Sequence, residues 1–274
     1  QARGISRPVY FVPATLNYAL VLEAETLIDD HLKGAGQSRY IIDDDESGQA
    51  ERWFRFFTKL SQLRSAMVLR FGEPLDPFCN PIDDEGRSLS PSGRTVDPAS
   101  YVKFRGVATV DAARDAGYTR ELGDAIAREY QRSTVILWTQ LVAHILYRQL
   151  VAQTPELDLF GRQRVRGATM PRAQLEAEVG EARDRLLAFA AAGLVRVGPV
   201  LQSQSPEKIV EEALTAWSGY HTRPAASAKG GEIVIDDPNL LLFYQNRLVP
   251  FAEELATPDT LAAARTIAAL GGRT

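Results

Sequence analysis

The sequence is poor in the residues that build disulfides, metal sites and thiol or imidazole chemistry. It has a single cysteine, Cys79, and three histidines, His31, His144 and His221. One cysteine excludes an intrachain disulfide framework and is typical of a protein in a reducing compartment. The histidines have no cysteine or acidic partner at ligand spacing, so the sequence predicts no metal site. No motif predicts a cofactor.

Long apolar runs are also lacking. No stretch of roughly 18 or more apolar residues occurs, so no transmembrane helix is expected, and there is no signal-peptide pattern. Methionine occurs twice, as Met67 and Met170, and position 1 is Gln1. The chain is therefore expected to be processed or to be a piece of something longer.

Neither sign of charge dominates the sequence. The 31 lysines and arginines against 35 aspartates and glutamates give a net charge of -4, which argues against a generic binder of polyanions. A content of 45% hydrophobic and 24% charged residues predicts a folded chain rather than a disordered one. The length of 274 residues suits one or two domains.

The N-terminal part alternates strand and helix patterns. The predicted elements are a strand at 9–12, helices at 18–33 and 48–63, and a second strand at 65–71. The first strand is bounded by Pro8 and Pro13, which cannot donate to a ladder. Gly34 stands where a helix would end. The acidic run 43–46 is interpreted as a solvated helix start rather than a cation site.

Residues 76–100 are rich in proline, serine, glycine and aspartate and are expected to form one long loop, with no internal repeat in the chain. Loops of this length are uncommon in compact domains and are usually functional or mobile. The loop leads to a predicted boundary near Gly106, which divides the chain into domains 1–106 and 107–274. Cys79 lies in it without a histidine-bearing motif, so no catalytic thiol is expected.

The second domain is predicted to be mainly helical. Helices are expected at about 119–132, 134–153, 169–192, 206–217, 239–255 and 258–270. Thr169 is expected to cap the third of these and Gly193 to end it, and Ser205-Pro206 is expected to cap and open the fourth. The helix at 134–153 is apolar nearly all round and should be central and buried. Residues 220–222 and 232–235 are expected to pair as a hairpin across a glycine turn. This order allows a winged-helix-like fold, although the acidic residues of its helices oppose a phosphate backbone, so no nucleic-acid partner is predicted.

Three pieces of the N-terminal third share their order and spacing with one enzyme family. They are Arg-Gly-Ile-Ser-Arg-Pro-Val-Tyr-Phe-Val-Pro at 3–13, Asn17-Tyr18 with Val21 and Glu23 leading to 31–34, and 59–64 followed by Arg-Phe-Gly-Glu-Pro-Leu at 70–75. These pieces resemble the bacterial membrane-associated glycerol-3-phosphate acyltransferases, a family that includes dihydroxyacetone-phosphate acyltransferases. Residues 170–175 and 242–247 resemble the family's C-terminal helical region more loosely.

The resemblance implies a fold and an activity. The fold is the end of an acyltransferase-type α/β domain followed by a helical C-terminal domain. The activity is transfer of a fatty acyl group from acyl-CoA or acyl carrier protein to the 1-hydroxyl of glycerol 3-phosphate. Such an enzyme belongs to phospholipid biosynthesis and is peripheral on the cytoplasmic face of the inner membrane. In the family a His-x4-Asp box supplies the general base, and a Glu-Gly-x-Arg-Ser-Arg segment contacts the phosphate.

The sequence departs from the family at these two boxes. The residue five positions after each histidine is Gly36, Gln149 or Ala226 and never aspartate, and no Glu-Gly-x-Arg-Ser-Arg segment occurs. Both boxes lie in the family upstream of the block that opens this chain. The chain is therefore expected to be inactive alone and to need a missing N-terminal catalytic region as a partner. The alternative is a non-catalytic regulatory or interaction module derived from such an enzyme.

The resemblance implies no catalytic residue here, but it does imply substrate-site candidates. They are Arg3, Arg7, Pro13, Tyr18 and Glu23. The two arginines would help complete a phosphate or CoA site beside Pro8. Glu23 would pair with an active-site arginine, against the simpler interpretation of a solvated helix residue. The turn at Glu73 is expected to be structural.

One basic cluster stands out on this acidic chain. Its members are Arg162, Arg164 and Arg166, with Arg172 nearby. Anionic lipid headgroups attract such segments by roughly 1 kcal/mol per residue, which would suit an enzyme whose products enter the membrane. A charged loop between domains is the other interpretation, and both stay open.

Overall fold

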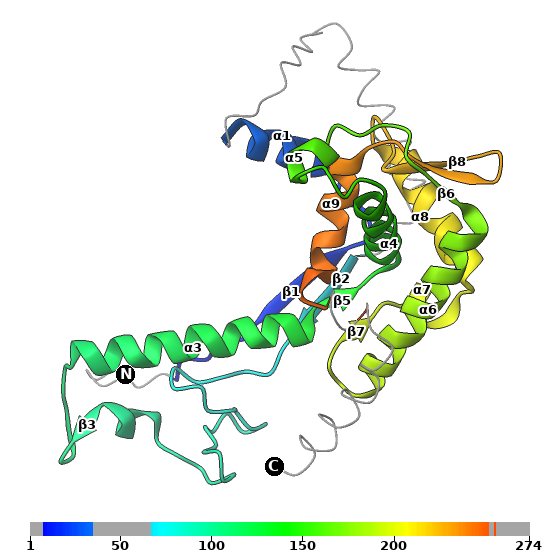
Figure 1. The fold of residues 1–274 in the computed structure, drawn as a ribbon. Helices are drawn as coiled ribbons and strands as arrows, with labels where there is room; N and C mark the ends of the chain where they lie inside the picture. Colours follow the sequence, from blue (N-terminus) through cyan, green and yellow to red (C-terminus); the bar gives the residue numbers. More distant parts are fainter. Residues whose placement is uncertain (1–7, 35–66, 252–254, 256–274) are drawn as a thin grey trace, which may run out of the picture. The chain divides into compact units, whose positions relative to one another are not determined.

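The computed structural model describes residues 8–34, 67–251 and 255 (Figure 1). The architecture is mixed helix and sheet, with small sheets of two or three strands. Within the described part of the chain, no helix is long and apolar enough to cross a membrane. Arg3, Arg7, the acidic run and the predicted helices at 48–63 and 258–270 lie outside the described residues.

The chain divides into two compact units, and each is described by itself. Unit 1 consists of Gln1–Leu16 and Val68–Thr134, and unit 2 of Asn17–Met67 and Val135–Thr274. The predicted boundary at Gly106 stays a prediction, and this residue falls inside unit 1.

The two strands β1 (Ala14–Tyr18) and β2 (Met67–Phe71) form a two-stranded sheet. The second strand confirms the prediction, but the strand predicted at 9–12 is wrong, because β1 begins only after Pro13. Proline has no N–H to donate, yet its carbonyl accepts a hydrogen bond from Gly72 N at 2.7 Å. The proline thus helps to fix how the chain enters the strand.

Alternate side chains of β1 are buried. The inward Thr15 donates its hydroxyl hydrogen to the carbonyl of Ser133 at 2.9 Å, at the end of α3 (Ala112–Ser133). This helix begins seven residues before the predicted start at Thr119. Asp111 sets the start, because its carboxylate accepts from the N–H groups of Ala113 and Arg114 at 3.0 Å each.

The predicted loop is an ordered seven-residue repeat, which the sequence analysis missed. Its four copies are 74–80, 81–87, 88–94 and 95–101. The second residue of each copy is apolar, and the third is aspartate or serine. Isolated bridges join successive copies, at Leu75↔Pro81, Ile82↔Ser88 and Leu89↔Thr95. The prediction failed because seven residues match neither the helical nor the strand period.

Each of the first three copies closes a turn in the same way. The N–H of the third residue donates to the carbonyl of the seventh, as from Asp76 to Asn80 at 2.9 Å. The sixth residue has a positive φ, of 65° at Cys79, 78° at Gly86 and 76° at Gly93. The fourth copy instead enters the 3-10 helix η2 (Pro98–Val102). A hairpin of β3 (Lys103–Phe104) and β4 (Val107–Ala108) then leads to α3.

Unit 2 is built around α4 (Trp138–Gln153), which confirms the predicted central helix. Eleven of its sixteen residues are buried. The helices packed on it are α6 (Arg172–Ala191), α8 (Pro206–Tyr220) and α9 (Pro238–Gln245), with η3 (Asn246–Phe251) after α9. Ser205 caps α8 as predicted, with its hydroxyl accepting from Lys208 N. Shorter pieces are α1 (Ala24–Gly34), α5 (Leu159–Arg162) and α7 (Pro199–Ser203).

Two small sheets complete unit 2. β5 (Val135–Ile136) pairs in parallel with β7 (Arg196–Val197). β6 (Thr169–Pro171), β9 (Glu232–Ile235) and β8 (Ala226–Lys229) form an antiparallel sheet in the order β6-β9-β8. The hairpin prediction was right for β9 and the glycine turn but wrong for its first strand, because α8 continues to Tyr220. The predicted helix at 18–33 is α1, which starts later because Tyr18 belongs to β1.

Candidate functional site

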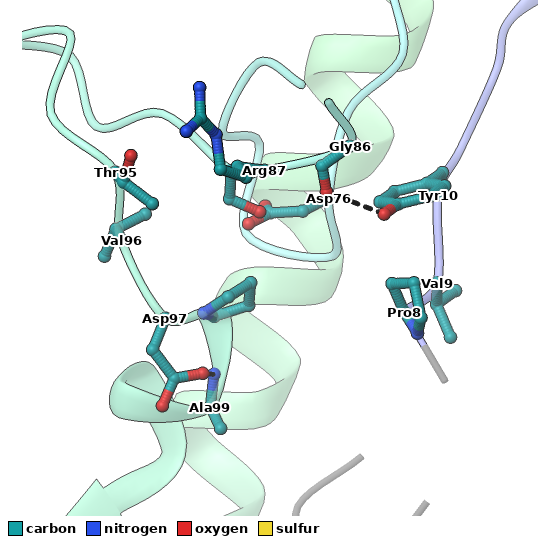
Figure 2. A pocket seen from close by; sticks show the side chains of 12 residues that line it. Pro8, Val9, Tyr10, Asp76, Gly86, Arg87, Thr95, Val96, Asp97 and Ala99 are labelled. Atoms are coloured by element: carbon teal, nitrogen blue, oxygen red, sulfur yellow. Dashed lines mark hydrogen bonds between the residues drawn. The ribbon is translucent and has the colours of Figure 1, made fainter. Parts of the chain in front are cut away.

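A hollow of about 360 Å³ lies in unit 1 (Figure 2). It adjoins residues 8–10, which belong to the piece 3–13 that resembles the acyltransferases. Residues 8–10 form one wall, and the repeated turns form the rest through Asp76, residues 86–88 and residues 95–99. Two pairs of lining residues hold equivalent positions in the repeat, Ser88 with Thr95 and Asp76 with Asp97. All four copies of the repeat contribute to the lining.

Tyr10 joins the two walls. Its hydroxyl donates to the carbonyl of Gly86 at 2.7 Å, as the dashed line in Figure 2 shows. Gly86 suits this position for two reasons. Its φ of +78° disfavours other residues, and a Cβ there would lie 3.0 Å from the Tyr10 hydroxyl oxygen. The contact therefore fixes residues 8–10 against the second copy of the repeat.

Asp76 anchors the first copy and is only 1% exposed. Its carboxylate accepts from Phe78 N at 2.8 Å and from both the backbone N and the side-chain Nδ2 of Asn80 at 2.9 Å. The side-chain oxygen of Asn80 accepts in turn from the Tyr101 hydroxyl at 3.1 Å. Phe78 stacks on Tyr101 and meets Tyr118 edge-on, with centroids 4.7 and 5.0 Å apart. These contacts fix the position of Asp76, which lines the hollow.

The charges around the hollow are already paired. Arg87 contacts Asp83 at 2.8 Å and Glu85 at 2.7 Å, and Lys103 contacts Asp97 at 3.1 Å. The pKa of Asp83 is lowered, first by the backbone N–H of Arg87 and then by its guanidinium. The pKa of Asp97 is lowered by a hydrogen bond from the backbone of η2 and by Lys103. The described lining offers an anionic ligand backbone and hydroxyl groups, but no uncommitted cation.

Three of the five predicted substrate-site residues are described, and none of them lines this hollow. Pro13 is buried and acts through its carbonyl on Gly72. Tyr18 ends β1 and lines a second, smaller cavity in unit 2. Glu23 is exposed just before α1. By contrast with Glu23, the neighbouring Glu25 makes hydrogen bonds. Its carboxylate accepts from the N–H and the hydroxyl of Thr222 at 3.5 and 3.4 Å.

The basic cluster is only partly available to a ligand. Arg162 donates to the carbonyl of Thr154 through two nitrogens, both at 3.3 Å. Arg166 donates to the carbonyls of residues 163 and 165 at 3.0 and 2.8 Å. Arg172 pairs with Glu176 at 2.7 Å. Arg164 is exposed.

Unit 2 also contains buried polar groups that the sequence analysis did not single out. The Tyr244 hydroxyl accepts from Val21 N at 3.1 Å and lies 2.8 Å from Nε2 of His221. Nδ1 of His144 lies 3.4 Å from the side-chain oxygen of Gln245. Burial lowers the pKa of both histidines and raises that of Tyr244. All three groups are therefore neutral near pH 7.

Asn17 is another such group. It is 1% exposed, and neither side-chain polar atom has a partner among the described residues. Its position inside a strand gives no sequence signal of this. The described residues contain no group of three or more histidine, cysteine, aspartate or glutamate side chains that could hold a metal ion.

Comparisons of the chain with protein-family models, with curated proteins and with solved structures find no match.

Proposed function

We propose that the chain is part of a glycerol-3-phosphate acyltransferase. The intact enzyme would move a fatty acyl group from acyl-CoA or acyl carrier protein to the 1-hydroxyl of glycerol 3-phosphate. The motifs at 3–34 and 59–75 support this activity. Dihydroxyacetone phosphate is the related acceptor, and the boxes that would separate the two acceptors do not occur in this sequence.

One structural observation supports the proposal most directly. Two of the three pieces that carry the resemblance, the one ending at Pro13 and the one ending at Leu75, are neighbours in unit 1. Phe11 and Leu75 exchange backbone hydrogen bonds of 2.8 and 2.9 Å, and Gly72 N donates to the carbonyl of Pro13 at 2.7 Å. Segments more than fifty residues apart in sequence thus act as one structural element, as expected of two blocks of one enzyme domain.

The proposal places the chemistry on a separate catalytic region. None of the 274 residues forms a His-x4-Asp box, and the hollow in unit 1 presents no histidine. A hydroxyl attacks a thioester effectively only when a positioned base takes its proton. In this proposal unit 1 completes the acyltransferase domain, and Arg7, next to Pro8 in the sequence, supplies a cation toward the phosphate.

For unit 2 we propose a winged-helix-like arrangement. The order α4, β6, α6, α8, β8 and β9, with the sheet order β6-β9-β8, supports it. The acidic residues of α8, Glu207, Glu211 and Glu212, argue against a nucleic-acid partner. We place the protein peripherally on the cytoplasmic face of the inner membrane, with Arg164 and Arg166 toward anionic lipid.

The missing boxes favour a second candidate, a regulatory or interaction module without catalysis. The test recovers the native protein through a tag on the chromosomal copy of its coding sequence. Acyl transfer is then assayed with radiolabelled glycerol 3-phosphate or dihydroxyacetone phosphate and with palmitoyl-CoA or palmitoyl-acyl carrier protein. The recombinant 274-residue chain is the matched control. Activity that co-purifies with the native protein and is absent from the control supports the acyltransferase.

Two outcomes contradict the proposal in different ways. Turnover by the isolated chain would refute the separate catalytic region. A native preparation that sediments with membranes but transfers no acyl group to either acceptor would leave the non-catalytic module. The intact mass of the native protein, measured on the same sample, shows which polypeptide carries the activity.

A further inference from the structure

A second cavity, of about 210 Å³, lies entirely within unit 2. Its lining includes Tyr18 at the end of β1 and Gln140 in the first turn of α4. It also includes Tyr244 in α9 and Arg247 in η3. The helices α4 and α9 pack along one another, so the position of this cavity is set within one compact unit. It is separate from the hollow in unit 1.

The polar groups of this cavity are left with hydrogens to donate. Gln140 is only 3% exposed, and its side-chain oxygen accepts from Leu137 N at 3.0 Å. That bond fixes the orientation of the carboxamide and leaves Nε2 without a partner among the described residues. Asn246 behaves in the same way, since its side-chain oxygen accepts from Gln245 Nε2 at 3.4 Å. Both amides therefore have N–H groups available.

Another polar atom of the lining, the Tyr244 hydroxyl, is already committed. The Tyr244 hydroxyl accepts from Val21 N, so its own hydrogen is available for the nearby Nε2 of His221. Burial raises the pKa of Tyr244 and lowers that of His221, which keeps this pair neutral.

The charge of the cavity is positive. Arg247 is exposed at its edge and has no ion-pair partner in the described part of the chain, and no aspartate or glutamate lines the cavity. Glu25 is the acid whose charge acts on Tyr244. It is not part of the cavity lining, and its carboxylate accepts a hydrogen bond from the Thr222 hydroxyl. Arg247, Gln140 and Asn246 all line this cavity, and guanidinium and amide N–H groups are donors that bind phosphates and carboxylates. On a chain of net charge -4 this is a local exception.

We propose that this cavity binds the oxyanion head of a small ligand, a phosphate or a carboxylate. Arg247 supplies the charge, Gln140 and Asn246 supply oriented N–H groups, and Tyr18 with Phe243 supplies aromatic walls for the adjoining part of the ligand. The proposal does not rest on acyl transfer, because every group that it uses lies in unit 2. A ligand held there would bridge Tyr18, α4, α9 and η3 within unit 2.

Isothermal titration of the full chain with inorganic phosphate and, separately, with octanoate tests this site. The informative variant is Arg247→Gln, which removes the charge and keeps a shorter polar side chain. Arg223→Gln is the matched control, since Arg223 is an exposed arginine of the same unit outside the cavity. We expect millimolar binding of at least one probe. Arg247→Gln should weaken it about tenfold or more, as for a lost charge-assisted hydrogen bond, and the control should leave it unchanged.

The two probes separate the two sources of the oxyanion. Binding of phosphate alone identifies a phosphorylated ligand, and binding of octanoate alone identifies an acid with an apolar chain. Failure of both probes to bind at millimolar concentration overturns the proposal. Equal affinity of Arg247→Gln and the unchanged chain overturns it as well. Because Arg247 is exposed, the variant is expected to fold, and its far-UV circular dichroism verifies this.

Discussion

The buried carboxylate of Asp76 should be the main anchor of the seven-residue repeat. Asp76→Ala removes three acceptor contacts, to Phe78 N, Asn80 N and Asn80 Nδ2, from a site that is 1% exposed. Hydrogen bonds to a charged group contribute about 1.5 kcal/mol or more each. If water replaces one of the three, the loss is about 3 kcal/mol for unit 1, or about a hundredfold in the opening equilibrium.

Amide hydrogen exchange followed by mass spectrometry measures this opening. Peptides covering 74–101 and α3 should exchange about a hundredfold faster in Asp76→Ala, while peptides from α4 and α6 serve as the internal reference. Asp83→Ala is the matched control, because Asp83 is the equivalent residue of the next copy and its side chain is 15% exposed. It should have a clearly smaller effect. Less than a tenfold change in Asp76→Ala, or equal changes in both variants, would refute the anchoring role.

The remaining predictions concern the residues with positive φ in the repeat and the buried histidines of unit 2, and equilibrium unfolding tests them. Cys79→Gly should stabilise unit 1 by about 0.5 kcal/mol, because Cys79 has a φ of 65° where the next two copies have glycine. Conversely, Gly86→Ala should destabilise unit 1 more than Gly93→Ala, since only Gly86 faces the Tyr10 hydroxyl, and equal losses by urea titration would contradict this. Unit 2 should lose stability as the pH falls below about 6.5, because burial lowers the folded-state pKa of His144 and His221 below the unfolded value. Tryptophan-monitored unfolding should show a fall toward pH 5 that flattens in His144→Gln/His221→Gln, and an unchanged slope would exclude these histidines as its source.

Local signals in the sequence predicted many of the elements. The apolar run at 134–153 predicted the buried α4, and Ser205-Pro206 predicted the start of α8. The strand β2 and the end of α6 at Gly193 were also predicted correctly. Such signals succeed because burial periodicity and capping depend on residues within a turn or two of one another.

The errors arose where distant partners set the structure. At the start of β1, the carbonyl of Pro13 accepts a hydrogen bond from the N–H of Gly72, which is 59 residues further along the chain. The turns of the seven-residue repeat are held by side-chain caps and by bridges between copies. Neither produces an amphipathic pattern, so the sequence predicts only a loop there. Tyr18 and Glu23 are near one another in sequence, yet Tyr18 lines a cavity and Glu23 is exposed.

Composition and periodicity were enough to indicate a folded chain of mixed helix and strand, and the motifs of the N-terminal third, by their resemblance to one family, predict an acyltransferase without its catalytic boxes. They could not show which polar groups share a cavity. Gln140, Tyr244 and Arg247 converge only when α9 packs on α4, over a separation of about a hundred residues. Hydrogen-bond donors become a binding site when their other partners are fixed and acids are kept away, and both conditions depend on packing rather than on sequence spacing.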